Sequence, residues 1–279
     1  MNGDNFGQEQ ENRGIRATGG KIALAAVSVA ILGTGAGLAL TWGGSPSTGA
    51  APRARPAIPA AATSVARAVP AARTEPSIPM TTELATLRES AIRYASPGLV
   101  SGGSVPALWY GRKSVLPVVA TRPGWVEVRL AQRPNKSTAW VPATDVRLSS
   151  TPYRIVVNVT TMHLALYKYG RLVFTAAAGV GTTDDPTPTG HFFVAFDEPA
   201  PQPNPGYGSF IMVTSAHSPH ISDWEHSGDA IIGIHGPLGD DSEIGTTGAR
   251  VSHGCVRLHD QALERLSGVP AGTPLDVVS

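Results

Sequence analysis

The sequence predicts a mainly β protein, and three observations favour this fold class over a helical one. The chain has 279 residues, of which 31 are glycine and 24 are proline, and only 15% of its residues are charged. This composition is typical of turn-rich β structure combined with a low-complexity stretch. Short segments that alternate apolar and polar residues recur from about residue 114 onward. The net charge of +1 provides no basic field for nucleic acid, so no nucleic-acid partner is expected.

An uncharged apolar segment near the N-terminus predicts a membrane anchor. It runs for 21 residues from Ile22 to Trp42, and as a helix it would span about 30 Å, the thickness of a bilayer core. More basic residues precede this segment than closely follow it, which favours a cytoplasmic tail at 1–21 and a single pass with the C-terminus outside. The alternative is a cleaved signal peptide, and with either interpretation the rest of the chain is exported. The expected location is therefore the cell membrane, with the remaining domains facing the cell wall.

The next stretch, 43–80, is expected to be a linker. It is rich in alanine and proline and has no aromatic residue, so it cannot bury a core. From Thr82 to Tyr94 the spacing of Leu84, Leu87 and Ala91 predicts a short helix.

A small β domain is expected at 81–150. Alternating segments predict strands at Ser114 to Ala120, Trp125 to Leu130 and Thr138 to Pro142. The Gly-Trp-Val-x-Val run around Trp125 and the Ala-Trp-Val run around Trp140 resemble bacterial SH3-like domains. Such domains sometimes bind wall peptides, so two interpretations stay open: a wall-binding module, or a spacer that packs on the next domain.

The second half, 152–279, is also expected to be mostly β with one or two short helices. Apolar periodicity predicts four strands, a long loop rich in Pro, Gly, Ser and His, and one helix. The predicted strands are Tyr153 to Val159, His163 to Lys168, Arg171 to Val180 and His191 to Phe196; the loop is Asp197 to Ser227 and the helix is Asp260 to Leu266.

The single cysteine, Cys255, is the candidate nucleophile. A free thiol is mostly protonated at neutral pH, so a nucleophilic cysteine needs an imidazole that takes its proton. Two histidines are candidates for that base. His253 would lie on the same face as Cys255 in an extended segment, and His235, twenty residues upstream, would approach from a neighbouring strand. The other interpretation of Cys255 is a small buried hydrophobic residue.

The residues around both histidines resemble one known family. His235, sixteen intervening residues, and then Ser-His-Gly-Cys-Val-Arg-Leu at 252–258 are similar to the catalytic domain of L,D-transpeptidases (YkuD type). A Thr-Pro-x-Gly-x-Phe stretch that begins at Thr187, together with Gly181, extends the resemblance upstream. This resemblance implies a β-sandwich or barrel catalytic domain at 152–279 that needs no cofactor and no metal.

The resemblance also implies roles for individual residues. Cys255 would be the acylated nucleophile and His235 its general base, oriented by the backbone carbonyl of Gly236. The positions around the nucleophile would shape the site, carry the oxyanion amides or face the substrate. These positions are Ser252, His253, Gly254 and Arg257. Tyr207 is a candidate for a side-chain oxyanion donor.

The implied reaction is acyl transfer between peptidoglycan stem peptides, which forms 3→3 cross-links in cell-wall biogenesis. Carbapenems would acylate the same cysteine. The acyl acceptor stays open among a stem amine, a protein, a D-amino acid and water, and water would make the enzyme an L,D-carboxypeptidase. Three other readings are weaker. Sortases separate His and Cys more widely, papain-like endopeptidases place Cys first, and a wall-binding protein would not need the Ser-His-Gly-Cys motif.

A histidine cluster at 217, 220 and 226 raises the possibility of zinc. Solvated or hydrogen-bonded loop histidines are the more common outcome for such a pattern.

Overall fold

The computed structural model describes residues 78–279 except 202–204, 225 and 247–248. The predicted cytoplasmic tail, membrane anchor and most of the linker lie outside the described residues. Across the described part of the chain, no helix is long and apolar enough to cross a membrane.

The first part of the described chain, Thr82–Thr151, is a sheet of seven strands joined by tight turns. The sheet order is β3-β2-β8-β7-β6-β1-β9, and a small two-stranded hairpin, β4-β5, comes between β3 and β6 in the sequence. The elements are β1 (Thr82–Leu87), β2 (Ala91–Ser96), β3 (Leu99–Val105), β4 (Leu108–Trp109), β5 (Arg112–Lys113), β6 (Val115–Arg122), β7 (Trp125–Arg129), β8 (Thr138–Pro142), the 3-10 turn η1 (Ala143–Asp145) and β9 (Val146–Thr151). The three strands predicted for this part of the chain are confirmed as β6, β7 and β8.

The helix predicted between Thr82 and Tyr94 is wrong, because this stretch forms β1 and β2. Leu84 and Leu87 have the spacing of one helical face, but both are buried residues of strand β1. Strand β1 lies between β6 and β9, which satisfy its backbone on both edges. Tertiary pairing of this kind overrides a weak local helix preference.

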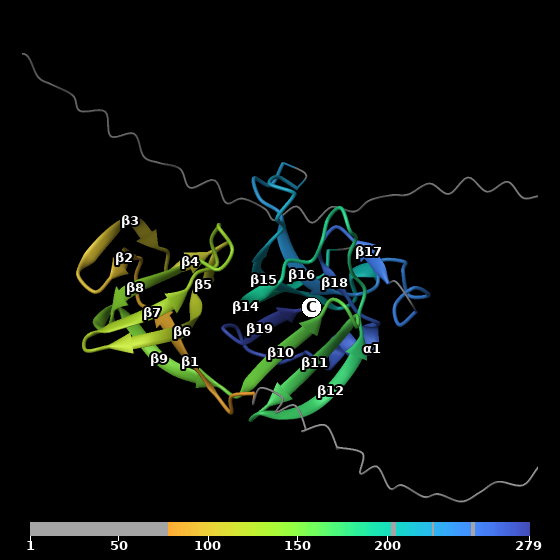
Figure 1. Cartoon of the computed structure of the whole chain (residues 1–279), viewed down its shortest axis with the longest axis horizontal. Helices are drawn as coiled ribbons and strands as arrows, with labels where there is room; N and C mark the ends of the chain where they lie inside the picture. The colour runs from red at the N-terminus through yellow and green to blue at the C-terminus, as the bar shows by residue number, and fades with distance from the viewer. Residues whose placement is uncertain (1–77, 202–204, 225, 247–248) are drawn as a thin grey trace, which may run out of the picture. The chain divides into compact units, whose positions relative to one another are not determined.

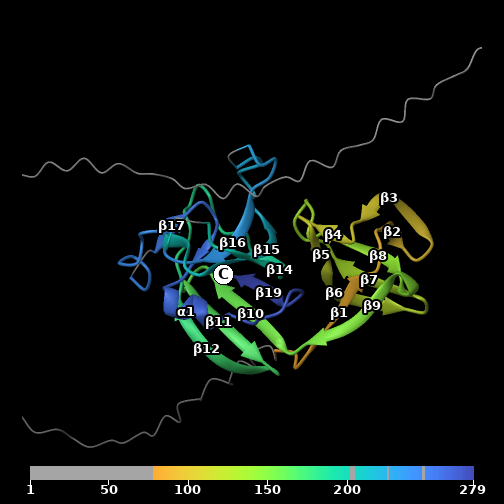
Figure 2. The ribbon, with the colours of Figure 1, turned by 180° about the vertical axis from the view of Figure 1, so that it is seen from behind.

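The second part, Tyr153–Ser279, is a sheet of eight strands with one short helix. Its order is β12-β11-β10-β19-β14-β15-β16-β18, and β13 and β17 form a further two-stranded pair. The elements are β10 (Tyr153–Asn158), β11 (His163–Lys168), β12 (Arg171–Ala177), β13 (Val180–Gly181), β14 (Gly190–Pro199), η2 (Pro205–Tyr207), β15 (Phe210–His217), β16 (Ile231–His235), β17 (Arg250–Ser252), β18 (Val256–Arg257), α1 (Asp260–Glu264) and β19 (Pro274–Val278). Figures 1 and 2 show β10, β11 and β12 side by side, in green, with β19 next to β10.

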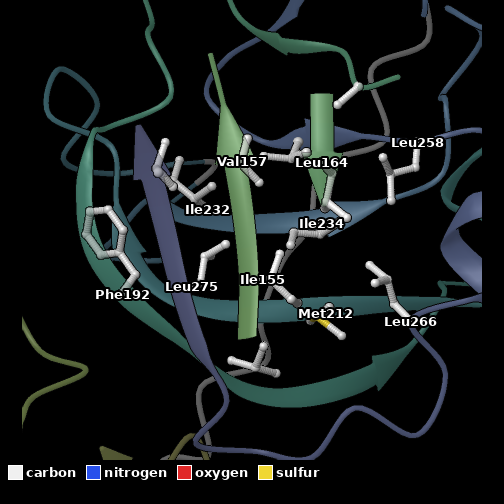
Figure 3. Close-up of a cluster of buried hydrophobic side chains, with 14 of the residues drawn as sticks. Ile155, Val157, Leu164, Phe192, Met212, Ile232, Ile234, Leu258, Leu266 and Leu275 are labelled. Carbon is white, nitrogen blue, oxygen red and sulfur yellow. The ribbon is translucent and has the colours of Figure 1, made fainter. Parts of the chain in front are cut away.

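Strand β14 joins the two halves of this sheet. Its first residues pair with β19, and its later residues pair with β15 after a register shift between Val194 and Phe196. A bulge of this kind bends a strand and lets one sheet curl around a core. The core lies within the curl and draws apolar side chains from both halves (Figure 3). Members drawn there include Ile155, Val157, Leu164, Phe192, Met212, Ile234 and Leu275.

The prediction of one continuous loop from Asp197 to Ser227 is wrong, because β14 continues to Pro199 and β15 occupies Phe210–His217. Most side chains of β15 are buried. The prolines and glycines that suggested a loop are concentrated before and after this strand, so the composition of the whole stretch concealed it. The mainly β prediction is confirmed for the described residues.

The two sheets share a buried apolar cluster. It contains Leu116 and Val128 from the first sheet and Phe193, Phe196 and Ile211 from the second. A continuous core of this kind indicates that Thr82–Thr151 packs on the second sheet and does not stand apart from it.

Candidate active site

The two strands β16 and β18 bring His235 and Cys255 to one face of the sheet. They pair in parallel, with Ile234 opposite Val256 and His235 opposite Arg257. Alternate residues of a strand share a face, so Gly233, His235, Cys255 and Arg257 all point to the same side. The backbone N–H of Gly233 donates to Sγ of Cys255 at 3.4 Å. The cysteine sulfur therefore lies against the backbone of β16, two residues before His235.

His235 is held as a neutral imidazole with a defined tautomer. Only 1% of the residue is exposed, and its Nδ1 lies 2.8 Å from the carbonyl oxygen of Gly236. A carbonyl can only accept, so Nδ1 carries the proton and Nε2 carries the free lone pair. Burial lowers the pKa of His235 to about 4, with a further lowering by the charge of Arg257, while the Gly236 hydrogen bond partly opposes this shift. At neutral pH the ring is therefore uncharged and able to accept a proton at Nε2.

Gly236 lies where no side chain fits. A Cβ at this position would come within 2.8 Å of three backbone atoms of Gly206, Tyr207 and Gly208. Its N–H donates to the carbonyl of Tyr207 at 2.8 Å, and the Tyr207 ring lies 4.9 Å from the His235 ring. The segment around η2 thus covers the imidazole and keeps the Gly236 carbonyl aimed at Nδ1.

Cys255 is also uncharged in its resting state. The residue as a whole is partly exposed, but its sulfur lies against buried β16. Burial raises the pKa of the thiol, and the hydrogen bond from Gly233 offsets only part of this shift. A neutral thiol beside a neutral imidazole can transfer its proton during attack on a carbonyl, and no stable thiolate–imidazolium pair is needed beforehand.

We call residues 252–255, which carry the candidate nucleophile Cys255, the nucleophile turn, and Ser252 holds its shape. Its hydroxyl donates to the carbonyl of Cys255 at 2.6 Å and accepts from the N–H of Gly254 at 3.1 Å. The Gly254 amide, expected from sequence to face a substrate oxyanion, is thus engaged within the turn. The φ angle of Gly254 is +123°, which favours glycine.

A buried threonine from the upstream motif supports the same turn. The hydroxyl of Thr187 donates to the carbonyl of Gly254 at 2.8 Å and accepts from the N–H of Gly181 at 2.9 Å. Gly181 cannot carry a side chain, because a Cβ there would meet the backbone of Asp185 at 2.3 Å. The Thr-Pro-Thr-Gly stretch and the Ser-His-Gly-Cys stretch therefore form one connected structure.

Arg257, expected at the substrate-facing surface, lies largely within the protein. Its guanidinium forms an ion pair with Asp240, and the side chain is 13% exposed. Burial lowers the pKa of Arg257, although it stays a cation. Its Nε has no hydrogen-bond partner among the described residues. The neighbouring Asp241 contacts His259 at 2.5 Å.

His253 lies at the protein surface. It is exposed, and its ring lies 5.1 Å from that of Trp224. Of the two histidines that the sequence left open as the base, only His235 is buried and fixed in the tautomer that a general base requires.

Two of the three histidines of the suspected zinc cluster have other partners. His217 is buried with Nε2 2.6 Å from the carbonyl of Ala131, and His220 contacts the carbonyl of Asp184. In the part of the chain that the structure describes, no group of three His, Cys, Asp or Glu side chains is arranged to hold a metal ion.

Three residues of the site were not singled out from the sequence. Gly233 has a signal, since it lies two residues before His235, and alternate residues of a strand share a face. Thr187 belonged to a recognised stretch, but nothing local indicated its hydrogen bond to Gly254. Trp224 has no signal, because its contact with His253 depends on the folded path of the loop.

Comparisons with known proteins identify relatives of this chain. The model of the L,D-transpeptidase catalytic domain (YkuD) matches residues 152–277. The YkuD protein of Bacillus licheniformis is 35% identical over 129 residues, which is 45% of this chain and 66% of that protein, just under two thirds. The YqjB protein of Bacillus subtilis is 31% identical over 144 residues, which is 49% of this chain and 76% of that protein.

A solved structure also aligns with the chain. It is L,D-transpeptidase 3 of Mycobacterium tuberculosis in complex with a faropenem-derived adduct, with 15% identity, coverage of 53% of this chain and 76% of that one, and a TM-score of 0.35. Both Bacillus relatives carry an L,D-transpeptidase name. On the domain match and the similarity to most of YqjB, the chain belongs to the L,D-transpeptidase family, with its YkuD catalytic domain at residues 152–277.

Proposed function

We propose that this protein is an acyltransferase that joins peptidoglycan stem peptides by 3→3 cross-links through a thioester on Cys255. The observation that carries the proposal is the pairing of β16 with β18. It puts Cys255 on the same face as a buried His235 whose Nδ1 donates to Gly236.

The first half-reaction forms the acyl-enzyme. Nε2 of His235 takes the proton of Sγ while the sulfur attacks the carbonyl carbon between residue three of a stem tetrapeptide and its terminal D-alanine. The carbon–nitrogen bond then breaks, and the proton passes from His235 to the departing amine. D-Alanine leaves, and the rest of the donor stem stays bound to Cys255 as a thioester.

The second half-reaction resolves the thioester. The side-chain amine of residue three of another stem attacks the carbonyl carbon, and His235 takes the proton that this amine loses. The carbon–sulfur bond breaks, and the proton returns to Sγ. If water replaces the amine, the same residues perform an L,D-carboxypeptidase reaction, so the acceptor decides between the two activities.

The oxyanion of each tetrahedral intermediate needs hydrogen-bond donors. The Gly254 N–H is bonded to Ser252, so we assign the principal role to the Cys255 amide at the start of the turn into β18. Tyr207, whose ring packs on His235, is the candidate side-chain donor. We assign the Arg257–Asp240 pair to the polar wall that borders the substrate.

The chain outside the catalytic domain would deliver it to the wall. We propose that 1–21 is cytoplasmic, that 22–42 anchors the protein in the cell membrane as a single pass, and that 43–80 is an extended linker. We further propose that 81–150 is an SH3-like domain. The apolar cluster that it shares with the catalytic domain supports a packing role over a freely moving wall-binding module.

The strained β-lactam ring of a carbapenem is an acyl donor that would react with the same thiol. We therefore propose that carbapenems acylate Cys255 and, lacking a leaving amine that departs readily, keep the enzyme inactive.

The test is turnover of disaccharide-tetrapeptide by the ectodomain, read by mass spectrometry for the wild type and for Cys255→Ala. A cross-linked dimer that has lost one D-alanine, and that is absent with Cys255→Ala, supports the transpeptidase. Tripeptide alone supports the carboxypeptidase. Folded wild-type protein that gives neither product nor a carbapenem adduct would contradict an acyl-enzyme mechanism.

A further inference from the structure

One loop of the first sheet reaches the segment that borders the exposed side of the nucleophile turn. This loop, 130–137, joins β7 to β8. Its residue Arg133 contacts the catalytic domain through all three guanidinium nitrogens. Nε lies 2.7 Å from Oδ1 of Asp229, Nη1 donates to the carbonyl of Ser218 at 3.0 Å, and Nη2 donates to the carbonyl of Ile221 at 2.9 Å. A planar guanidinium that engages three acceptors fixes their relative positions, which a single point charge cannot do.

Two further contacts attach the same loop to the end of β15. Asn135 donates to the carbonyl of His217 at 2.7 Å and accepts from the N–H of His217 at 2.9 Å, so its amide pairs with this residue as a neighbouring strand would. The His217 ring places Nε2 2.6 Å from the carbonyl of Ala131. Its Nδ1 lies 2.9 Å from Oδ2 of Asp229, although the angle is not that of a hydrogen bond.

These contacts lead directly to an aromatic ring beside the nucleophile turn. The N–H of Trp224 donates to the carbonyl of Asp229, the residue that Arg133 holds through its side chain. The Trp224 ring packs at 5.1 Å against the ring of His253, two residues before Cys255. Trp224 is partly exposed and His253 is exposed, so together they form an accessible aromatic wall on the turn that carries Cys255.

We propose that Arg133 is a positioning residue for substrate binding. It holds residues 218–224, and with them the Trp224 ring, against the nucleophile turn. The loop 130–137 then helps to shape the substrate site. The expected effect on kinetics rests on the proposed function.

The chain offers a matched control for this role. Arg112, in the β4–β5 hairpin, also links Thr82–Thr151 to the catalytic domain, through Glu198 at 2.9 Å, and no hydrogen bond or ion pair joins it to 218–224 among the described residues. Arg133→Met and Arg112→Met therefore both remove one cation and one ion pair between these two parts of the chain. Only Arg133→Met should loosen the wall beside His253.

The first readout does not depend on activity. Amide hydrogen exchange of 218–224, followed by mass spectrometry, is expected to accelerate on the order of tenfold in Arg133→Met, because three charge-assisted contacts are lost, and to stay at the wild-type rate in Arg112→Met. Arg133→Lys keeps a cation beside Asp229 but loses the planar guanidinium that engages three acceptors, so an intermediate rate of amide exchange at 218–224 is expected. Equal exchange of 218–224 in wild type, Arg133→Met and Arg133→Lys would overturn the inference, whether or not the enzyme uses tetrapeptide.

The second readout separates positioning from general stability. With disaccharide-tetrapeptide as substrate, KM should rise on the order of tenfold in Arg133→Met while kcat changes by less than about twofold, because Gly233, Gly236 and Ser252 hold the reacting groups independently of Arg133. Trp224→Ala should raise KM similarly, and adding Arg133→Met to it should raise KM no further. An additive double variant, or a KM that rises equally in Arg112→Met, would assign Arg133 a merely structural role. If Arg133→Met does not fold, Arg133→Lys carries both readouts with the same expected directions.

Discussion

The backbone N–H of Gly233 lies 3.4 Å from Sγ of Cys255, and this contact defines the geometry of the site. It joins two strands that pair in parallel although 22 residues separate these two positions in the sequence. The donor is a backbone amide of β16, so the thiol lies against this strand. His235 lies two residues further along the same face of β16, so one strand fixes both the amide that contacts Sγ and the imidazole.

The pH dependence of acylation should reflect a resting state in which His235 and Cys255 are both uncharged. The base works only when deprotonated, so the rate rises as pH rises through the pKa of His235. Burial lowers that pKa to about 4, so the acid limb should lie well below the ordinary histidine value of about 6.5. The measurement is kcat/KM for acylation by a carbapenem across pH 4 to 9, monitored by intact mass.

The same profile contains its own check. The rate should be nearly flat around neutrality, because the pKa of His235 is lowered and that of Cys255 is raised, away from this range. Cys255→Ala should form no adduct at any pH. An acid limb centred near 6.5 would mean that the base is solvated and that His235 is not in the buried state described above.

Removing the Ser252 hydroxyl should loosen the nucleophile turn. In Ser252→Ala, the carbonyl of Cys255 loses its donor and the buried N–H of Gly254 loses its acceptor. An unsatisfied buried group of this kind costs about 1–3 kcal/mol in the free energy of unfolding. The activation free energy of acylation should rise by at least as much as the free energy of unfolding falls, because the turn carries the reacting sulfur. Urea unfolding and acylation kinetics measure the two effects.

Ser149→Ala is the matched control for this prediction, since that serine is exposed on β9. It should leave stability and acylation unchanged. A Ser252→Ala protein that acylates at the wild-type rate would show that the turn holds its shape without the hydroxyl.

Much of this site could be predicted as candidates from local sequence, because its chemistry is concentrated in two short motifs. His235, Gly236 and Cys255 are candidates through the spacing of the motif, whereas strand alternation pointed to His253, which is exposed. Strands β8 and β11 have the predicted bounds. The helix predicted at Thr82 to Tyr94 was wrong for a physical reason: its outcome depended on β6 and β9, which are distant in sequence and supply the backbone partners. The contacts of Arg133 and Trp224 follow the same rule, since no local pattern indicates which loop meets which.

The hydrogen bonds of the Thr187 hydroxyl should matter more for stability and acylation than the volume of its side chain. Thr187→Val keeps the volume of the buried side chain but removes the donor to Gly254 and the acceptor for the Gly181 N–H. The expected cost is about 1–3 kcal/mol in the free energy of unfolding, with slower acylation. Thr187→Ser restores both hydrogen bonds and should recover most of the rate despite the lost methyl group. If Val and Ser variants behaved alike, the effect would be one of packing and the hydroxyl bridge would not support the nucleophile turn.

Gly254 should resist substitution for two separable reasons. Its φ of +123° is strained for any L side chain, at a cost of about 1–3 kcal/mol. A Cβ would also lie 2.7 Å from Cδ1 of Ile232, the end of a side chain in the buried core. Gly254→Ala should therefore lower the free energy of unfolding and slow acylation.

Ile232→Val removes that one methyl group and by itself should cost about 0.5–1.5 kcal/mol. In the double variant the steric contact is absent but the backbone strain persists, so the two changes should be less damaging together than the sum of each alone. Urea unfolding of the wild type, both single variants and the double variant measures this coupling. Strict additivity would show that the contact with Ile232 is relieved by side-chain movement, and that glycine is required at this position by its backbone angle alone.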